Sequence, residues 1–207
     1  LAGHIDDCMI KEMSWERLES VLAPKVKGAW NLHKATIDQP LDFFITYSSM
    51  ASQFAPTNQS NHAAANAFLD ALGNFRNNLG LPSMTINWGA WSKIGQAAAK
   101  KDIEEQLKMQ GMGTISPDKG IEIVAHLFEN KMEQVTVAPV DWVKFVKQVG
   151  THPLFAHLAK EKKTKDLSPT DKTFLKDKFA TDHSSSKERR YINGDETTSL
   201  KIISNEL

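Results

Sequence analysis

Cysteine and long apolar runs are nearly absent from this sequence. The single cysteine, Cys8, leaves no partner for an internal disulfide, and the seven histidines show none of the spacings of a structural zinc site. We expect Cys8 to be a small buried apolar residue and expect no bound metal. No run approaches the roughly 20 apolar residues that cross a bilayer, and residues 1–7 lack the regions of a signal peptide. These absences predict a cytoplasmic protein that does not bind a membrane.

An excess of charge of either sign is also missing. The 25 basic and 25 acidic residues cancel, and 41% of all residues are apolar. The composition is that of an ordinary globular domain, and it gives no indication of a nucleic-acid partner. The sequence starts at Leu1 without a methionine. We therefore expect it to be a fragment.

Helical and strand-like segments alternate over the first two-thirds of the chain, which predicts an α/β fold with a parallel sheet. A helix is expected from Ser14, across a kink at Pro24, to about residue 32. Residues 61–78 predict a second, alanine-rich helix that ends before Gly80. Its apolar residues at helical spacing are Ala64, Phe68, Ala71, Phe75 and Leu79.

Strands are expected at residues 42–49, 83–89 and 135–138, because these runs are rich in β-branched and aromatic residues. The first run is continuous, which predicts a strand buried on both faces. Residues 90–99 are rich in small side chains and predict a loop that covers a ligand. A further helix is expected after Ser116-Pro117, a capping residue followed by a first-turn proline.

Beyond about residue 150 the composition becomes lysine-rich and polar. We therefore divide the chain into a catalytic-type portion, residues 1–150, and a polar, largely irregular linker, residues 151–207. Short helices are expected at Ser168-Pro169 and near residues 198–207, and neither encloses a core by itself.

Four polar residues fall where the carboxyl ends of parallel strands form a ligand crevice. Ser49 ends the first strand, and His62 and Asn66 lie four residues apart near the start of the following helix. Lys25 lies in the preceding helix. A hydroxyl, an imidazole, an amide and an ammonium together suit polarising a carbonyl group and giving it a proton. Each also has a purely structural interpretation, as a strand-end hydrogen bond, a surface histidine, a helix amide and a solvated lysine.

Several segments resemble the ketoreductase domains of type I modular polyketide and fatty-acid synthases, a branch of the short-chain dehydrogenase/reductase superfamily. They occur in the family's order over roughly residues 1–150. They are Gly3-His4-Ile5-Asp6-Asp7, residues 23–33 (APKVKGAWNLH), Tyr47-Ser48-Ser49, residues 61–71 (NHAAANAFLDA) and residues 87–91 (NWGAW).

The resemblance implies the C-terminal part of a doubly wound, Rossmann-like fold. It also implies reduction of a β-ketoacyl thioester to the β-hydroxyacyl thioester with hydride from NADPH. The implied partners are an acyl carrier protein whose phosphopantetheine holds the substrate, the N-terminal half of the ketoreductase, and other synthase domains. No Gly-x-Gly-x-x-Gly phosphate loop follows a strand here, because in the family this loop lies upstream. Residues 1–207 alone are therefore expected to bind NADPH poorly.

The resemblance also implies the roles of the four polar residues. Ser49 takes the place of the serine that hydrogen-bonds the ketone oxygen, and Lys25 and Asn66 take the lysine and asparagine positions, with Lys25 also contacting the cofactor. His62 stands where the family has a tyrosine proton donor. An imidazolium also donates a proton, although a neighbouring Lys25 lowers its pKa. Tyr47 is an alternative donor, which competes with a simpler role in the core.

Three further residues bear on substrate binding and stereochemistry. Ile5-Asp6-Asp7 resembles the Leu-Asp-Asp signature of ketoreductases that form the D-configured alcohol, which assigns Asp7 to this role. Phe54 stands about where the opposite class has tryptophan, and Trp88 follows the second strand's polar Asn87. Trp88 also has an interpretation as core packing. The competing function is a degenerate, structural ketoreductase-like module, or a fragment without independent function.

Overall fold

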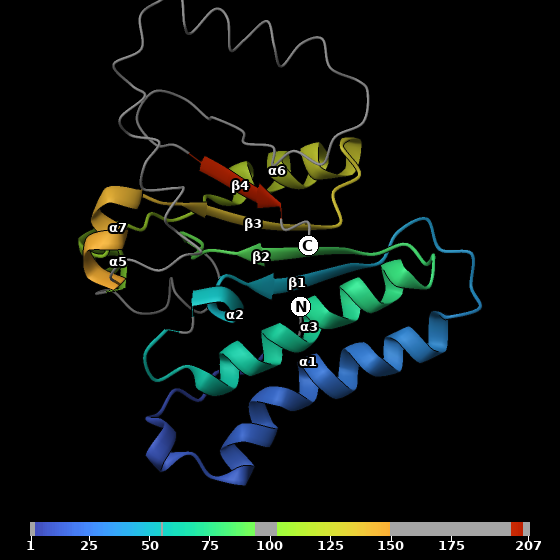
Figure 1. Cartoon of the computed structure of the whole chain (residues 1–207), viewed down its shortest axis with the longest axis horizontal. Coiled ribbons are helices and arrows are strands. Elements are labelled where there is room, and N and C mark those ends of the chain that lie inside the picture. Colours follow the sequence, from blue (N-terminus) through green and yellow to red (C-terminus); the bar gives the residue numbers. More distant parts are fainter. Residues whose placement is uncertain (1–2, 55, 94–102, 150–199, 205–207) are drawn as a thin grey trace, which may run out of the picture.

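The computed structural model describes residues 3–54, 56–93, 103–149 and 200–204. Its centre is a parallel sheet of β1 (Ile45–Ser49), β2 (Met84–Trp88) and β3 (Gln134–Pro139), which lie side by side in that order. Figure 1 shows the three strands with their carboxyl ends on the same side of the molecule. The expected parallel α/β fold is confirmed.

The fourth strand, β4 (Leu200–Ser204), pairs antiparallel with β3. We expected a short helix near residues 198–207, and this expectation was wrong for residues 200–204. The segment contains two isoleucines, which favour extended backbone, and the outer side of β3 offers unpaired backbone groups. The expected helix at Ser168-Pro169 lies outside the described residues.

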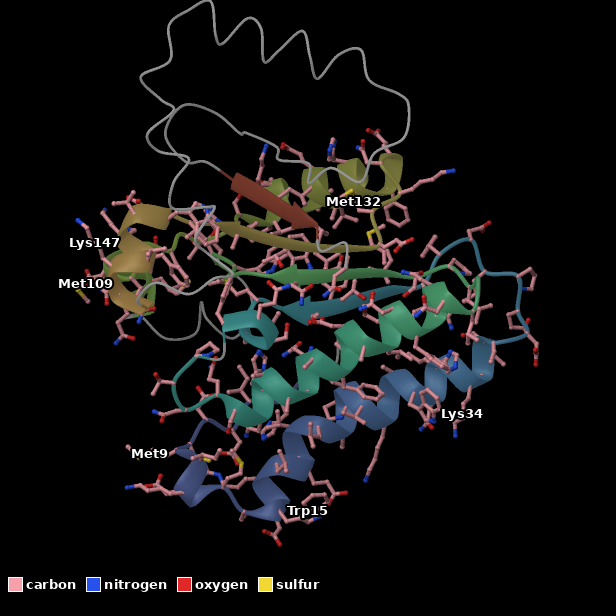
Figure 2. The ribbon with its side chains drawn as sticks, viewed as in Figure 1. Met9, Trp15, Lys34, Met109, Met132 and Lys147 are labelled. Carbon is pink, nitrogen blue, oxygen red and sulfur yellow. The ribbon has the colours of Figure 1, made fainter. Side chains whose placement is uncertain are left out.

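Two long helices form the layers on one side of the sheet: α1 (Trp15–Thr36) packs on α3 (Ser60–Asn78), and α3 packs on the strands. The expected cap is confirmed, because the Ser14 side chain accepts a hydrogen bond from the backbone N–H of Arg17. α1 continues through Pro24, and its exposed ends are marked in Figure 2 by Trp15 and Lys34. α3 ends before Gly80, whose φ of 73° reverses the chain.

The buried face of α3 differs from the expected apolar row. Ala64, Ala71, Phe75 and Leu79 are exposed, and the side chains that face the sheet and α1 belong to another row. An alanine-rich helix has small apolar residues on every face. The apolar pattern therefore does not show which face of α3 is buried. The buried residues are Asn61, Ala65, Asn66, Leu69, Leu72, Gly73 and Arg76.

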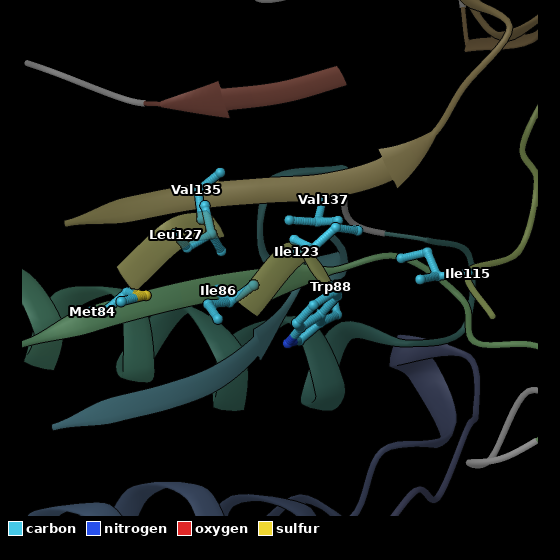
Figure 3. Packing of buried hydrophobic residues seen from close by; sticks show 8 residues of the cluster. All are labelled: Met84, Ile86, Trp88, Ile115, Ile123, Leu127, Val135 and Val137. Atoms are coloured by element: carbon cyan, nitrogen blue, oxygen red, sulfur yellow. The ribbon is translucent and has the colours of Figure 1, made fainter. Parts of the chain in front are cut away.

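The opposite face of the sheet is covered by α6 (Pro117–Glu129), whose Ser116 cap is confirmed by its bond from the Lys119 N–H. Ile123 and Leu127 of α6 enter the main hydrophobic core. Figure 3 shows these side chains between α6 and the strands. The remaining members of this core are Met84, Ile86, Trp88, Ile115, Val135 and Val137.

The first strand begins later than expected. Residues 42–44 precede β1, and Phe43 is 58% exposed, with its ring against that of Phe128 at 5.3 Å between centroids. The apolar run therefore continues beyond the sheet, and its outer part contacts α6. Cys8 is buried, as predicted.

Short elements collect near the carboxyl ends of the strands. They are α2 (Ala51–Phe54), α5 (Ile103–Met109) and α7 (Trp142–Val149), as Figure 1 shows, and η1 (Ile10–Glu12) precedes α1. A second apolar cluster of Ala138, Val140, Trp142 and Phe145 joins α7 to this end of the sheet. Most of the expected covering loop, residues 94–99, lies outside the described residues. In the described ranges, no helix combines the length and apolarity needed to cross a membrane.

Candidate active site

The site is built from α1, the end of β1 and the first turns of α3. Three of the four polar residues predicted from the sequence, Lys25, His62 and Asn66, lie on the two helices that pack against each other. The fourth, Ser49, is the last residue of β1. The fold therefore places all four near the carboxyl end of β1, the first strand of the described sheet, and ligands bind at this end in open parallel sheets.

Lys25 connects α1 to β1. Its Nζ donates a hydrogen bond to the backbone oxygen of Tyr47, at 3.1 Å, two residues before Ser49. Burial lowers the pKa of Lys25, and the negative charge of Asp70 opposes that effect. Lys25 is consequently a held ammonium group rather than a solvated surface lysine.

His62 lies in the first turn of α3, and its Nδ1 is buried and has no hydrogen-bond partner within the described part of the chain. Burial lowers the pKa of His62, and the positive charge of Lys25 lowers it further, whereas Asp7 raises it. The charge of Lys25 therefore acts on the His62 imidazole. An imidazole in this setting is mostly neutral at neutral pH and becomes an acid only at lower pH.

Asn66 is completely buried one turn further along α3. Its Nδ2 donates to the backbone oxygen of His62 at 2.8 Å, which fixes the orientation of the amide. The Oδ1 atom has no partner among the described residues. A buried amide oxygen without a partner is costly, so it is an acceptor available to a water molecule or ligand.

Ser49 closes β1 with its hydroxyl available as a donor. Its Oγ accepts a hydrogen bond from the backbone N–H of Ala51 at 3.2 Å, which leaves the hydroxyl proton for another acceptor. Its backbone oxygen lies within 2.9 Å of Ser52 Oγ and 3.4 Å of Asn87 Nδ2. These bonds fix the position of the strand end.

A polar network behind the site was not predicted. Asn87 of β2 is fully buried, and its Nδ2 lies 2.9 Å from both carboxylate oxygens of Asp70 and 3.1 Å from Ser48 Oγ. Asp70 belongs to the same helical row as His62 and Asn66, at intervals of four residues, and that spacing was a usable signal. Asn87 gave no such signal, since its contacts are all distant in sequence.

The segment around Asp7 lies against the start of α3. Gln59 Nε2 is 3.2 Å from both carboxylate oxygens of Asp7, and Asn61 Nδ2 donates to the backbone oxygen of Asp6. Arg17 forms an ion pair with Asp6, and its hydrogen bond lowers the pKa of that carboxyl group. Asp7 is therefore held close enough to His62 to affect its titration.

The other predicted contact residues lie further into packed regions. Trp88 is 5% exposed and belongs to the main core, where its ring lies 5.8 Å from Tyr47 and 4.8 Å from Trp91 between centroids. Phe54 of α2 packs edge-on against Phe145 of α7. The position of Trp88 agrees with its alternative interpretation as core packing, and the roles of Phe54 and Trp88 toward substrate stay predictions.

These groups suit acid–base chemistry at a carbonyl oxygen. Ser49 and His62 supply hydrogens for donation, Lys25 supplies positive charge, and Asn66 supplies an unpartnered acceptor. The residues fit the polar nicotinamide-ribose end of a nucleotide cofactor, because the half-buried Lys25 ammonium and the Asn66 amide oxygen, which has no partner among the described residues, match its hydroxyl groups. No Gly-x-Gly-x-x-Gly motif that would receive its pyrophosphate occurs in the 207 residues.

The sequence is similar to known polyketide synthases. It is 42% identical to polyketide synthase GfsE of Streptomyces halstedii over 126 residues, which are 59% of this chain and 3% of GfsE. It is 38% identical to a phthioceranic/hydroxyphthioceranic acid synthase of Mycobacterium tuberculosis over 142 residues, which are 67% of this chain and 7% of that protein. The chain thus spans a small part of these relatives.

The fold is similar to solved ketoreductases. It matches PlmKR1, from the first module of phoslactomycin biosynthesis in Streptomyces sp. HK803, with a TM-score of 0.72 and 27% identity. That match covers 77% of this chain and 37% of PlmKR1. Residues 1–93 match the KR domain family, which includes the segments that hold Lys25, Ser49, His62 and Asn66. The chain therefore belongs to the ketoreductase domain family of modular polyketide synthases.

Proposed function

We propose that this chain supplies the acid–base half of a β-ketoacyl reductase within a polyketide synthase. The substrate is a β-ketoacyl thioester on the phosphopantetheine of an acyl carrier protein, and the product is the β-hydroxyacyl thioester. The observation that supports this best is the assembly of Lys25, His62 and Asn66 beside the end of β1, where Ser49 lies. The N-terminal half of the ketoreductase and other synthase domains complete the assembly.

In the proposed reaction the chain's residues bind and protonate the ketone oxygen. The Ser49 hydroxyl donates a hydrogen bond to that oxygen, which increases the positive character of the carbonyl carbon. The protonated imidazole of His62 gives its proton to the oxygen as negative charge develops there. Lys25 adds positive charge nearby, and Asn66 holds the start of α3 through its bond to the His62 backbone.

NADPH is the proposed cofactor, and when bound it supplies the hydride for the carbonyl carbon. Lys25 and Asn66 are the residues of this chain that would hold its nicotinamide-ribose end. Both are positioned by bonds to the backbone, Lys25 to Tyr47 and Asn66 to His62. A site for the phosphate groups must come from outside these residues.

A structural, catalytically degenerate module is the second candidate. One observation favours it: the pKa of His62 is lowered by burial and by Lys25, so little imidazolium is present at neutral pH. Against it, Lys25 and Asn66 are held by specific hydrogen bonds that a scaffold does not need. The two candidates differ in whether turnover occurs as His62 becomes protonated.

Asp7 supports a proposal about stereochemistry. Its carboxylate accepts a hydrogen bond from Gln59 just before the N-terminus of α3, and its charge acts on His62. A fixed acidic segment at this point constrains the side from which the substrate approaches. We propose the D-configured alcohol as product, with Asp7 as its main determinant and with Phe54 and Trp88 shaping the surroundings.

The test is NADPH oxidation by the full-length synthase protein with a β-ketoacyl thioester, from about pH 5.5 to about pH 8.5. The acid form of His62 is the active form, and its pKa is lowered. The rate should therefore rise as pH falls below histidine's usual pKa of about 6.5.

The His62→Ala variant should oxidise NADPH about 100-fold more slowly than wild type at the acidic end of the series. His62→Tyr should regain activity at pH 7.5, because a phenol stays protonated there.

His126→Tyr, on the opposite side of the sheet, is the matched control and should leave the profile unchanged. Chiral analysis of the same product mixtures should give mainly the D-alcohol, and mainly L-alcohol would contradict the stereochemical proposal. Absence of turnover at every pH, with NADPH binding confirmed, would reject the reductase and favour the structural module.

A further inference from the structure

We propose that Asp70 is a positioning residue of this site, which holds the end of β1 at Ser49 through its contacts with Ser52 and Asn87. The expected effect of Asp70 on turnover rests on the proposed function, whereas its contacts within the fold do not. Asp70 lies on α3 in the same row as His62 and Asn66, and no part of the reaction described above uses it.

The first step is the contact of Asp70 with two other elements. Ser52 Oγ of α2 lies 2.6 Å from Asp70 Oδ2, and Asn87 Nδ2 of β2 lies 2.9 Å from both oxygens. Asn87 is fully buried, and its Oδ1 accepts from Gln134 Nε2 of β3 at 3.2 Å, which fixes which end of the amide faces Asp70. One carboxylate therefore joins α3 to α2 and β2.

The second step leads from this network to Ser49. Ser52 Oγ and Asn87 Nδ2 are also the two groups near the backbone oxygen of Ser49, at 2.9 and 3.4 Å. Asp70 accepts hydrogen bonds from the same two groups and thereby orients both side chains toward the end of β1. Removing the carboxylate frees Ser52 and Asn87 to turn, and the end of β1 that carries the Ser49 hydroxyl loses its fixed position.

The third step leads to Lys25. Its ammonium is directed at the Tyr47 backbone oxygen, which is a neutral acceptor and compensates the charge only in part. Burial lowers the pKa of Lys25 and the charge of Asp70 raises it. On α3, the titratable groups that act near this ammonium are His62, which becomes cationic, and Asp70, which is anionic. Asp70 is thus the group that favours the charged lysine.

The test measures the charge state of Lys25 without turnover. The full-length protein is labelled with acetic anhydride over a pH series, and the acetylation of Lys25 is followed by peptide mass spectrometry. Asp70→Asn keeps the size of the side chain and removes its charge, so half-maximal labelling should move to lower pH. The control is Asp38→Asn, an equal change at an exposed position after α1, which should leave the labelling midpoint in place.

Activity tests the positioning role separately. In the NADPH assay, Asp70→Asn and Ser52→Ala should each lower kcat/KM by about 10- to 100-fold, as expected for misplaced reacting groups. Ser52→Ala keeps the carboxylate and should leave the Lys25 midpoint unchanged. The exchange Asp70→Asn with Asn87→Asp restores an amide–carboxylate pair, and it should be more active than either single variant.

An unchanged Lys25 midpoint in Asp70→Asn would overturn the charge role. Activity within twofold of wild type in both Asp70→Asn and Ser52→Ala would overturn the positioning role. If Asp70→Asn fails to fold, Asp70→Glu replaces it: retained charge should preserve the midpoint, and displaced hydrogen bonds should lower kcat/KM. A wild-type protein without turnover rejects the proposed function, while the labelling series still decides the effect of Asp70 on Lys25.

Discussion

Arg76 is buried in this protein, although arginine side chains usually lie in solvent. Its side chain is fully buried, its guanidinium lies 3.9 Å above the Phe44 ring, and two of its nitrogens donate to the Pro82 backbone oxygen. The third lies 3.1 Å from His33 Nδ1. Because arginine only donates, Nδ1 of His33 must accept, so this buried imidazole is neutral in the folded protein.

This pair predicts a loss of stability in acid. Burial and the charge of Arg76 lower the pKa of His33, so below about pH 6.5 the unfolded chain binds a proton that the folded chain does not. The contribution of neutral His33 to the free energy of unfolding is fully present above about pH 6.5, and it decreases as the pH falls below that value. Hydrogen–deuterium exchange of α1 and α3, corrected for intrinsic rates, should show lower protection at pH 5.5 than at pH 7.5.

His33→Gln removes the titrating group and keeps an acceptor for Arg76. The variant should lose less protection on acidification than wild type, whereas His126→Gln on α6 should behave as wild type does. His62 also has a lowered pKa and contributes in the same direction, so the difference between variants is the informative quantity. Equal pH dependence in wild type and His33→Gln would show that His33 is not the cause.

At the scale of elements, the contact between α3 and β2 depends on a missing side chain. A Cβ atom on Gly73 would overlap Thr85 Oγ1 and would lie 3.4 Å from Thr85 Cβ. Thr85 is buried, and its hydroxyl is 2.8 Å from that of Thr46 on β1. Gly73 therefore allows α3 to approach the two strands that form the back of the site.

Two glycine substitutions should have opposite effects on stability. Gly73→Ala forces α3 away from β2 and should reduce the free energy of unfolding by about 1–3 kcal/mol. Gly28→Ala lies within α1, where the nearest atom to a new Cβ is the Ala23 oxygen at 3.9 Å. It should increase stability by about 0.5–1 kcal/mol, because alanine favours the helix. Urea unfolding midpoints measure both, and equal shifts would contradict the packing argument.

The same elements show what a sequence pattern predicts and what it does not. Helix and strand periods located α1, α3, β2, β3 and α6, because those signals are local. They did not select the buried face of α3, where Arg76 is inside and Phe75 is 44% exposed. That choice depends on partners distant in sequence, the ring of Phe44 and the imidazole of His33. A prediction from hydrophobicity alone would place the Arg76 side chain in solvent.

The site divides in the same way. Lys25, Ser49, His62 and Asn66 were predicted by residue type, helical spacing and family resemblance, and the structure brings their elements together. Asp70 shares the helical row of His62 and was within reach of the same reasoning. Asn87 was not, because its contacts with Asp70, Ser48, Ser49, Ser52 and Gln134 exist only once the sheet and α3 have packed.

At the scale of the whole molecule, the described residues supply one side of the ligand site proposed above. The chain covers 37% of PlmKR1. The groups that we propose take part in the reaction lie on α1, β1 and α3, whereas the sequence has no Gly-rich loop that leads from a strand into a helix. Backbone N–H groups at such a helix start are what usually neutralise a pyrophosphate.

Residues 1–207 by themselves should therefore bind NADPH weakly. Isothermal titration calorimetry should detect no micromolar binding to the 207-residue chain, and it should detect binding to the full-length protein. Far-ultraviolet circular dichroism of the shorter chain serves as the control, because helical signal shows that α1 and α3 have formed. Micromolar binding by the helical 207-residue chain would mean that these residues alone create a phosphate site, and the division of the site proposed above would then be wrong.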